Sequence, residues 1–275
     1  MYLNLDKSFN PYMGEEIPFE CFDFPGGESH IKISGSHSNE VTITHRIRSF
    51  NDVGMILLAA DALRRMGTGR LELMIPYFPA ARQDRVMVKG EPLSVKVMAE
   101  IFNSLKLDKI TVFDPHSEVT PALLNNCEVI YNYDFIGKVM EDIGEEVLLA
   151  APDGGALKKI YKVSEALEGV PVVECGKMRD VKTGKLTGFR VNTDDLGGKN
   201  CLIVDDICDG GGTFNGLAEE LKKKNAGNLY LAVSHGIFSK GFDDLFKHFK
   251  GIYTTDSFSD IKDERVTQFK LEDLI

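Results

Sequence analysis

The 275-residue chain has no tryptophan, and no apolar stretch approaches the roughly 20 residues needed to cross a bilayer. Its first residues, MYLNLDKSFN, lack the apolar segment of a signal peptide. No run of lysine and arginine stands out and the formal net charge is -10, so nucleic acid is not expected as the main partner. We therefore expect a cytoplasmic protein without a membrane or nucleic-acid partner.

Cysteine is scarce and shows no metal-binding or disulfide pattern. The five cysteines are an odd number without a C-x-x-C pair, which predicts reduced thiols and neither a disulfide framework nor a zinc site. Two common phosphate motifs are also missing, since there is no G-x-x-x-x-G-K-[ST] and no G-x-G-x-x-G after a predicted strand. An acidic protein still binds phosphates where glycine loops, metal ions or a few basic side chains neutralise them.

Strand and helix periods alternate along most of the chain. Strands are expected over 40–47, 70–78, 109–114, 146–153, 170–175, 200–206 and 228–236. Helices are expected over 53–67, 92–107, 134–144, 155–167 and 214–226. This β-α-β order predicts an α/β fold with mainly parallel sheets flanked by helices, in which ligands bind beyond the carboxyl ends of the strands.

Several predicted strands end in polar residues, which packing alone does not explain. These residues are Asp114 with His116, Asp153, Asp205 with Asp206, and Ser234 with His235. The connection over 176–199 is rich in Gly, Lys and Thr, and its length is typical of a functional lid or a disordered insertion. We expect two similar α/β halves, 1–133 and 134–275.

The stretch CLIVDDICDGGGTF, residues 201–214, combines a buried strand, two adjacent carboxylates and three glycines. Converging backbone N–H groups and a helix that begins near Phe214 would bind a phosphate without a lysine. Asp205 and Asp206 suit neighbouring hydroxyls or a hydrated Mg²⁺. A phosphate beside a diol describes a 5-phosphorylated ribose. Strand-to-helix turns also contain Gly and Asp for their backbone angles alone, so the rest of the chain has to decide.

This stretch and five further segments point to a family. Within it, VDDICDGGGT resembles the phosphoribosyl-binding signature shared by type I phosphoribosyltransferases and ribose-phosphate pyrophosphokinases. PYFPAARQDRVMVKGEPLSVK is similar to the ATP-site segment of the pyrophosphokinases, and FDPHS, APDGG, SHGIFS and FPGGE resemble four more of their segments. The likeness, from about Phe24 to Lys240, implies two phosphoribosyltransferase-type domains. It also implies transfer of the β,γ-diphosphoryl group of ATP, with Mg²⁺, to the 1-hydroxyl of ribose 5-phosphate, releasing AMP.

The resemblance implies roles for individual residues. Metal contact falls to His116 and Asp153, and catalysis to Lys177 and Arg179. The ribose hydroxyls fall to Asp205 and Asp206, and the 5-phosphate to Asp209, Gly210, Gly211, Gly212 and Thr213. The nucleotide falls to Phe24, Glu28, Arg82, Gln83, Asp84 and Arg85. In the family the FPGGE loop reaches the adenine of a neighbouring subunit, which implies a homo-oligomer with an inter-subunit ATP site.

Two departures from the family pattern concern the adenine contact and the acceptor. Gly26 stands where the adenine loop has Asp, and Gly210 stands where the phosphate loop has Thr. Gly210 loses a hydroxyl and gains space, which would suit a 5'-extended ribose such as ADP-ribose, a compound of NAD metabolism. A phosphoribosyltransferase and a non-catalytic regulatory relative are further alternatives, although ARQDR, Lys177 and Arg179 count against them. The remaining histidines have no motif and are expected at the surface: His30, His37, His45 and His248.

Overall fold

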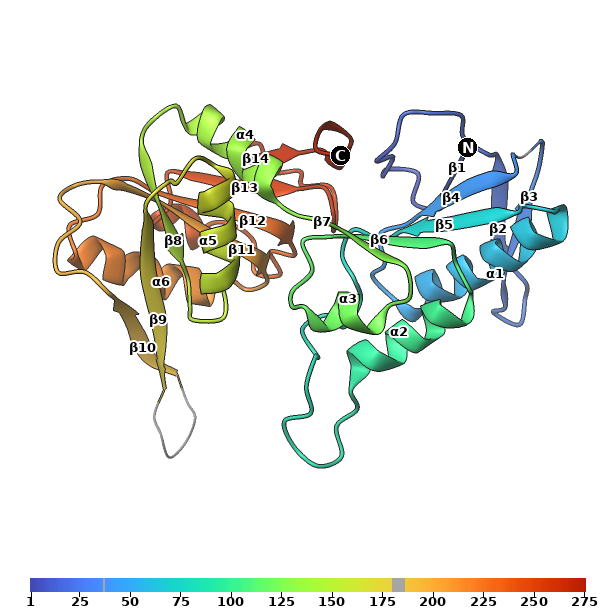
Figure 1. Cartoon of the computed structure of the whole chain (residues 1–275), viewed down its shortest axis with the longest axis horizontal. Coiled ribbons are helices and arrows are strands. Elements are labelled where there is room, and N and C mark those ends of the chain that lie inside the picture. The colour runs from blue at the N-terminus through green and yellow to red at the C-terminus, as the bar shows by residue number, and fades with distance from the viewer. Residues whose placement is uncertain (37, 180–185) are drawn as a thin grey trace. The chain divides into compact units, whose positions relative to one another are not determined.

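The structure is a computed structural model that describes residues 1–36, 38–179 and 186–275. The backbone divides into two compact units, each with its own central sheet (Figure 1). Unit 1 comprises Met1–Tyr131 with Lys270–Asp273 and Ile275, and unit 2 comprises Asn132–Phe269 with Leu274.

Unit 1 is built on a five-stranded parallel sheet with the strand order β1-β4-β5-β6-β7. The strands are β1 Tyr2–Asn4, β4 Glu40–Thr44, β5 Arg70–Met74, β6 Lys109–Phe113 and β7 Cys127–Ile130. The helices are α1 Phe50–Met66, α2 Ser94–Ser104 and α3 Val119–Leu123, and a short 3₁₀ helix spans Leu271–Asp273. A separate antiparallel hairpin pairs β2 Phe19–Asp23 with β3 Ser29–Ile33.

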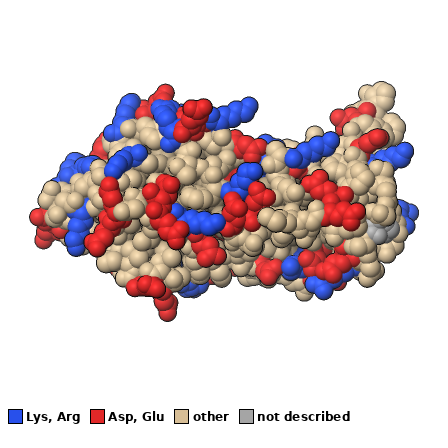
Figure 2. All heavy atoms as spheres, turned by 90° about the horizontal axis from the view of Figure 1, so that it is seen from above, with Lys and Arg blue, Asp and Glu red and all other residues tan. Residues whose placement is uncertain are grey.

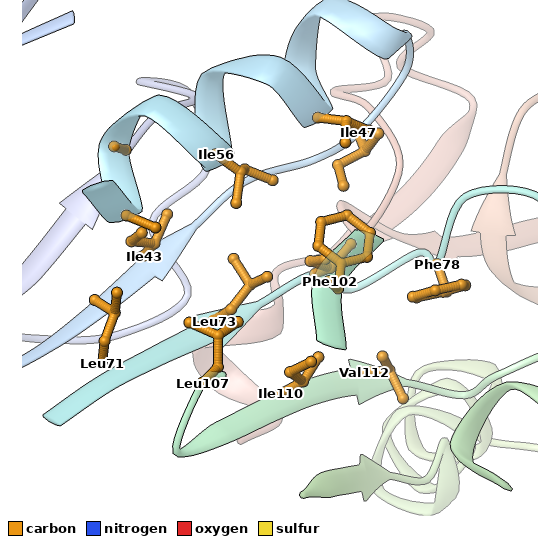
Figure 3. Packing of buried hydrophobic residues seen from close by; sticks show 14 of the residues in the cluster. Ile43, Ile47, Ile56, Leu71, Leu73, Phe78, Phe102, Leu107, Ile110 and Val112 are labelled. Atoms are coloured by element: carbon orange, nitrogen blue, oxygen red, sulfur yellow. The ribbon is translucent and has the colours of Figure 1, made fainter. Parts of the chain in front are cut away.

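Helix α1 illustrates how the local sequence sets these elements. The Ser49 side chain accepts the N–H of Asp52, and the Asp52 carboxylate accepts the N–H of Ser49 at 2.7 Å, which closes a capping box. The helix ends at Met66, and Gly67 caps it with a left-handed φ of +98°, which favours glycine. Ile56 on its buried face points toward the sheet that carries Ile43 (Figure 3). This packing forms the core of unit 1.

Unit 2 is built on a seven-stranded sheet with the order β10-β9-β8-β11-β12-β13-β14, in which only the β9–β10 pair is antiparallel. The strands are β8 Val147–Ala151, β9 Val172–Arg179, β10 Leu186–Val191, β11 Asn200–Cys208, β12 Leu229–Gly236, β13 Gly251–Thr255 and β14 Val266–Phe269. The helices are α4 Tyr133–Ile143, α5 Leu157–Ala166 and α6 Gly212–Lys223, and a 3₁₀ turn spans Leu245–Lys247. The predicted α/β class, with parallel sheets flanked by helices, is confirmed.

Part of the connection expected over 176–199 forms strands, and its role as a lid stays a prediction. Strand β9 extends to Arg179, and β10 returns beside it with Phe189 opposite Lys177. Phe189 and Val191, two residues apart on β10, are both buried, so this stretch has the alternation of a half-buried strand. Residues 180–185 of the predicted connection lie outside the described residues.

The surface is mixed in charge, and the interior holds most of the cysteines. Acidic and basic side chains are interspersed over the face drawn in Figure 2. Across the ranges that the structure describes, no helix has both the length and the apolar character to cross a membrane. All five cysteine thiols are free, and burial raises the pKa of Cys175 to about 12 and that of Cys201 to about 11. At neutral pH these two thiols are protonated and are poor nucleophiles.

Candidate active site

The acidic pair Asp205 and Asp206 lies on β11, which is paired in parallel with both β8 and β12. Asp206 is buried, with 6% of the residue exposed. Its N–H donates to Asp205 Oδ1 at 2.9 Å. Burial raises the pKa of Asp205 well above its ordinary value, and the charges of Asp206 and Asp153 raise it further. Full ionisation of this pair is therefore costly, and a hydrogen bond from a hydroxyl or a bound cation would stabilise the charged form.

The glycine loop joins this strand to helix α6. Strand β11 continues through Cys208, and α6 begins at Gly212, two residues before the predicted start near Phe214. Gly211 has a left-handed φ of +76°, and its carbonyl accepts the N–H groups of Phe214 and Asn215 at 3.0 Å each. Helix α6 starts from glycine without a side-chain cap, so no N-cap side chain competes with a ligand for its first N–H groups.

Glycine is needed in this loop for two different reasons. At Gly211 the φ is left-handed, and an added Cβ would meet Leu245 Cδ2 at 3.0 Å. At Gly212 the direction of a Cβ is open for 4 Å, which lets a ligand approach the backbone closely. Thr213 follows on the first turn of α6 and is partly exposed. These features leave the loop backbone open to a ligand, and its phosphate-binding role stays a prediction.

Lys177 and Asp153 meet at the carboxyl ends of the unit 2 strands. Lys177 Nζ lies 2.7 Å from Asp153 Oδ2, while the N–H groups of Gly155 and Ala156 donate to Asp153 Oδ1 at 2.9 and 3.2 Å. Burial raises the pKa of Asp153, but the hydrogen bond and charge of Lys177 and the two N–H bonds outweigh it, so the pKa is lowered. Asp153 is thus ionised at neutral pH. Arg179 ends β9, two residues after Lys177.

The ARQDR and FDPHS segments come together in unit 1. Asp84 lies in the connection between β5 and α2, and its side chain is 6% exposed although Arg85 beside it is 72% exposed. Burial raises the pKa of Asp84, but the hydrogen bonds from Arg85 and Ser117 and the charges of Arg85 and His116 outweigh this effect, so the pKa is lowered. The carboxylate is therefore an ionised group that holds the two segments next to each other.

The other two residues of the predicted ATP segment are exposed. Arg82 and Gln83 both present their side chains to solvent, and the Gln83 carbonyl accepts the N–H of Val95 at the start of α2 at 3.4 Å. In the part of the chain that is described, no group of three or more His, Cys, Asp and Glu side chains is placed to hold a metal ion. His116 belongs to unit 1 and Asp153 to unit 2.

The β2–β3 hairpin carries an exposed aromatic cluster. Phe24 is 47% exposed and Phe22 is 43% exposed, with ring centroids 5.3 Å apart, and His30 lies 5.7 Å from Phe24. The Phe24 N–H donates to the Glu28 carbonyl at 2.9 Å, which closes the turn. A Cβ at Gly26 would meet Glu28 Oε2 at 2.8 Å, so Glu28 occupies the space of the side chain that Gly26 lacks. The sequence analysis did not predict that Phe22 and His30 form a cluster with Phe24. The available signal was the position of these aromatic residues on either side of the predicted loop.

The histidine predictions need one correction. His45 was expected at the surface but is 7% exposed, because it follows β4 directly into the interior of unit 1. Its Nε2 lies 3.4 Å from Asp52 Oδ1, and burial lowers the pKa of His45 although the charge of Asp52 opposes this. His30 is exposed and His248 is partly exposed, while His37 lies outside the described residues.

Two family models match the chain, one in each unit. Residues 12–105 match the N-terminal domain of ribose phosphate pyrophosphokinase, and residues 132–272 match the phosphoribosyl transferase domain. A crystal structure of phosphoribosylpyrophosphate synthetase from Mycobacterium smegmatis has the same fold, with a TM-score of 0.81 at 23% identity over 94% of this chain and 88% of that chain. The predicted fold of two phosphoribosyltransferase-type domains is confirmed.

Curated relatives narrow the class further. The ribose-phosphate pyrophosphokinase of Pyrococcus abyssi is 33% identical over 234 residues, which cover 83% of this chain and 79% of that protein. The one from Thermococcus kodakarensis is 32% identical over 227 residues, or 82% of this chain and 80% of that protein. The chain belongs to the ribose-phosphate pyrophosphokinase family and is an enzyme of the diphosphotransferase type.

Proposed function

We propose that the enzyme transfers the β,γ-diphosphoryl group of ATP to the 1-hydroxyl of ribose 5-phosphate. The 1-oxygen bonds to the β-phosphorus, the bond from that phosphorus to the α-phosphate oxygen breaks, and the hydroxyl proton is lost as AMP leaves. The observation that carries this proposal is the pairing of Lys177 with Asp153 at the sheet edge that also holds Asp205, Asp206 and the glycine loop. Unit 2 thereby combines a positively charged lysine with a loop and an acidic pair that suit a sugar phosphate.

The sugar phosphate is held by the chain's own groups. The carboxyl oxygens of Asp205 and Asp206 accept hydrogen bonds from two ribose hydroxyls, which relieves the crowding of negative charge at this pair. The backbone from Asp209 to Thr213 binds the 5-phosphate, supported by the open approach at Gly212 and by the N-terminal end of α6. These contacts fix the 1-hydroxyl in place, and positioning is the main requirement in phosphoryl transfer.

Asp153 fits a Mg²⁺ ion by its chemistry. It is an ionised carboxylate, and Mg²⁺ usually keeps several waters and takes only one or two carboxylates together with substrate phosphates. We infer that Asp153 is a metal contact of unit 2, and separately that His116 is a metal contact of unit 1. When bound, Mg²⁺ neutralises phosphate oxygens of ATP and makes the β-phosphorus more electrophilic.

Lys177 is the proposed catalytic cation of this chain, with Arg179 as its companion on β9. An ammonium and a guanidinium beside the transferred group stabilise the charge that spreads over the phosphoryl oxygens in the transition state. The Lys177 side chain is 25% exposed, so water screens its charge less than it would at a fully exposed position. A regulatory relative without catalysis would have no use for a lysine held at this edge.

The nucleotide is assigned to unit 1 and to oligomer formation. Arg82, Gln83, Asp84 and Arg85 make up the proposed ATP segment, with Asp84 as its buried anchor. Phe24 and Glu28 lie on the exposed hairpin turn, where an aromatic face is available for an adenine ring. We propose that this turn reaches the ATP site of a neighbouring copy, which makes the enzyme a homo-oligomer.

The experiment is to supply ATP and Mg²⁺ with one acceptor at a time and to follow AMP release. Ribose 5-phosphate should give AMP and the 1-diphosphate in equal amounts. AMP release with ADP-ribose alone would keep the reaction and change the acceptor to a 5'-extended ribose. AMP release with neither acceptor, together with consumption of a ribose 1-diphosphate and a nucleobase, would replace the proposal with a phosphoribosyltransferase.

A further inference from the structure

The segment after β12 is fastened to the glycine loop by four hydrogen bonds. The N–H groups of Ile237 and Phe238 donate to the Cys208 carbonyl at 2.9 and 3.1 Å. Ser239 donates twice to Asp209, from its N–H to the carbonyl at 3.1 Å and from its hydroxyl to Oδ1 at 2.6 Å. The backbone of residue 240 is therefore held in register with residue 210 by contacts made just before both positions.

The side chain of Lys240 crosses the bare backbone of Gly210. A Cβ placed on Gly210 would lie 3.3 Å from both Cδ and Cε of Lys240 and 3.6 Å from its Cγ. The ammonium follows Cε by one bond, so the stem carries the positive charge across the glycine loop. The extra space expected at Gly210 is consequently filled by the lysine stem.

The charge of Lys240 is not committed elsewhere among the described residues. Lys240 is exposed and has no ion pair within the described part of the chain. Its field lowers the pKa of Asp244, but the larger cause is the ion pair of Asp244 with Lys247 at 2.5 Å. Asp209, whose carboxylate is held by Ser239, adds a negative charge to the loop that a bound phosphate would have to tolerate. A cation here compensates for both.

We propose that Lys240 binds the phosphate on the 5-oxygen of the ribose, and that glycine at position 210 is what lets its side chain reach the loop. A lysine ammonium offers three donors and a compact charge, which suits a phosphate held on its other sides by backbone N–H groups. A Cβ at position 210 would crowd this path, so the two residues act as a pair. The inference rests on the proposed sugar-phosphate site and names a further binding residue of that site.

The test is calorimetric titration of the full chain with ribose 5-phosphate, with ADP-ribose and with unphosphorylated ribose. Lys240→Met keeps an unbranched stem and removes the charge. For whichever phosphorylated probe the wild type binds, this variant should bind about ten- to hundredfold more weakly, the usual range for a hydrogen bond to a charged group. Its affinity should also depend less on salt, because one fewer charge contacts the phosphate.

Lys223→Met is the matched control, because it removes the same charge from the other end of α6. It lies eleven residues along the helix from Gly212 (223 − 212 = 11), or about 16 Å at 1.5 Å per residue. Its affinity for the phosphorylated probes should equal that of the wild type. A loss as large as that of Lys240→Met would overturn the inference, because the effect would then be one of net charge.

A second pair of variants tests the link to Gly210. Gly210→Ala is compatible with the backbone, since its φ is outside the left-handed range, but its Cβ forces the Lys240 stem to move. It should weaken binding several-fold in the wild type and leave it unchanged in Lys240→Ala, a non-additive result. Equal losses in both backgrounds would overturn the pairing of the two residues.

Binding and turnover separate this inference from the proposed reaction. If the wild type binds ribose 5-phosphate but releases no AMP, the proposed reaction fails and the titrations still decide the role of Lys240. If the wild type is active and Lys240→Met binds the phosphate as tightly as the wild type, the role of Lys240 fails and the reaction stands. Failure of the wild type to bind either phosphorylated probe would overturn the role of Lys240 as well.

Discussion

Replacing Asp205 with asparagine should make the protein more stable while it removes activity. The charged form of Asp205 is disfavoured first by burial and then by Asp206. Asparagine has the same shape, and its Oδ1 keeps the hydrogen bond from the Asp206 N–H that measures 2.9 Å in the wild type. Asp205→Asn therefore removes a costly charge without removing the contact.

The pH dependence of this effect has a definite sign. Because the pKa of Asp205 is raised in the folded protein, its contribution to stability is present below the ordinary carboxyl pKa and is lost as the pH rises through the raised value. At pH 8 Asp205→Asn should be more stable than the wild type, because the variant has no charge to bury at this position. The gain should shrink as the pH falls and approach zero only well below the ordinary carboxyl pKa of 3.8, where Asp205 is protonated in both states.

Urea unfolding without metal or substrate measures this gain at several pH values. The chain has no tryptophan, so far-ultraviolet circular dichroism is the appropriate signal. Asp244→Asn is the matched control, because Lys247 lowers the pKa of Asp244 and removal of this carboxylate should bring no gain at pH 8. A uniform loss of stability for Asp205→Asn at every pH would refute the argument that the charge at Asp205 is costly.

Three further predictions concern the reaction and the packing of unit 2. Lys177→Met should lower kcat by about 100-fold with little change in the acceptor KM, as expected for a group that acts on the transition state, and steady-state kinetics with retained ATP binding would check it. EDTA should abolish AMP release and added Mg²⁺ should restore it, while Asp153→Asn should need more Mg²⁺ for half-maximal rate; an unchanged Mg²⁺ requirement would contradict its role. Gly216→Ala should cost about 1–3 kcal/mol because its Cβ would lie 2.4 Å from Phe189 Cε2, whereas Gly137→Ala, 3.5 Å from its nearest neighbour, should be neutral or stabilising in urea unfolding.

The sequence predicted the parallel layers well because long periodic segments specify their own faces. The helix over 53–67 and the strand over 200–206 both formed within a few residues of their expected bounds. The short elements escaped prediction, among them β13 and β14, because four or five residues carry too little periodicity to be told from a loop. Strand β10 was missed because its pairing with β9 depends on a long-range contact of Phe189 with α6.

Within the candidate site, the local motifs were visible in the sequence and the partnerships between them were not. The acidic pair and the glycine loop could be read directly from residues 201–214. The contact of Lys177 with Asp153 joins residues 24 positions apart, and that of Lys240 with Gly210 joins residues 30 apart (240 − 210 = 30). His45 was misplaced for the same reason, because only the folded sheet carries the residue after β4 into the interior.

The strand order of unit 2 gives its two chemical functions different resistance to local opening. Strand β11, with the acidic pair, has three strands on each side, whereas β9, with Lys177, is second from the edge. Fluctuations that release an edge begin at β10 and reach β9 before they reach β11. Amide hydrogens around Asp205 should consequently exchange with solvent more slowly than those around Lys177. If β9 carries the catalytic lysine and β11 the sugar site, as proposed, mild denaturing conditions should abolish turnover before they abolish sugar binding.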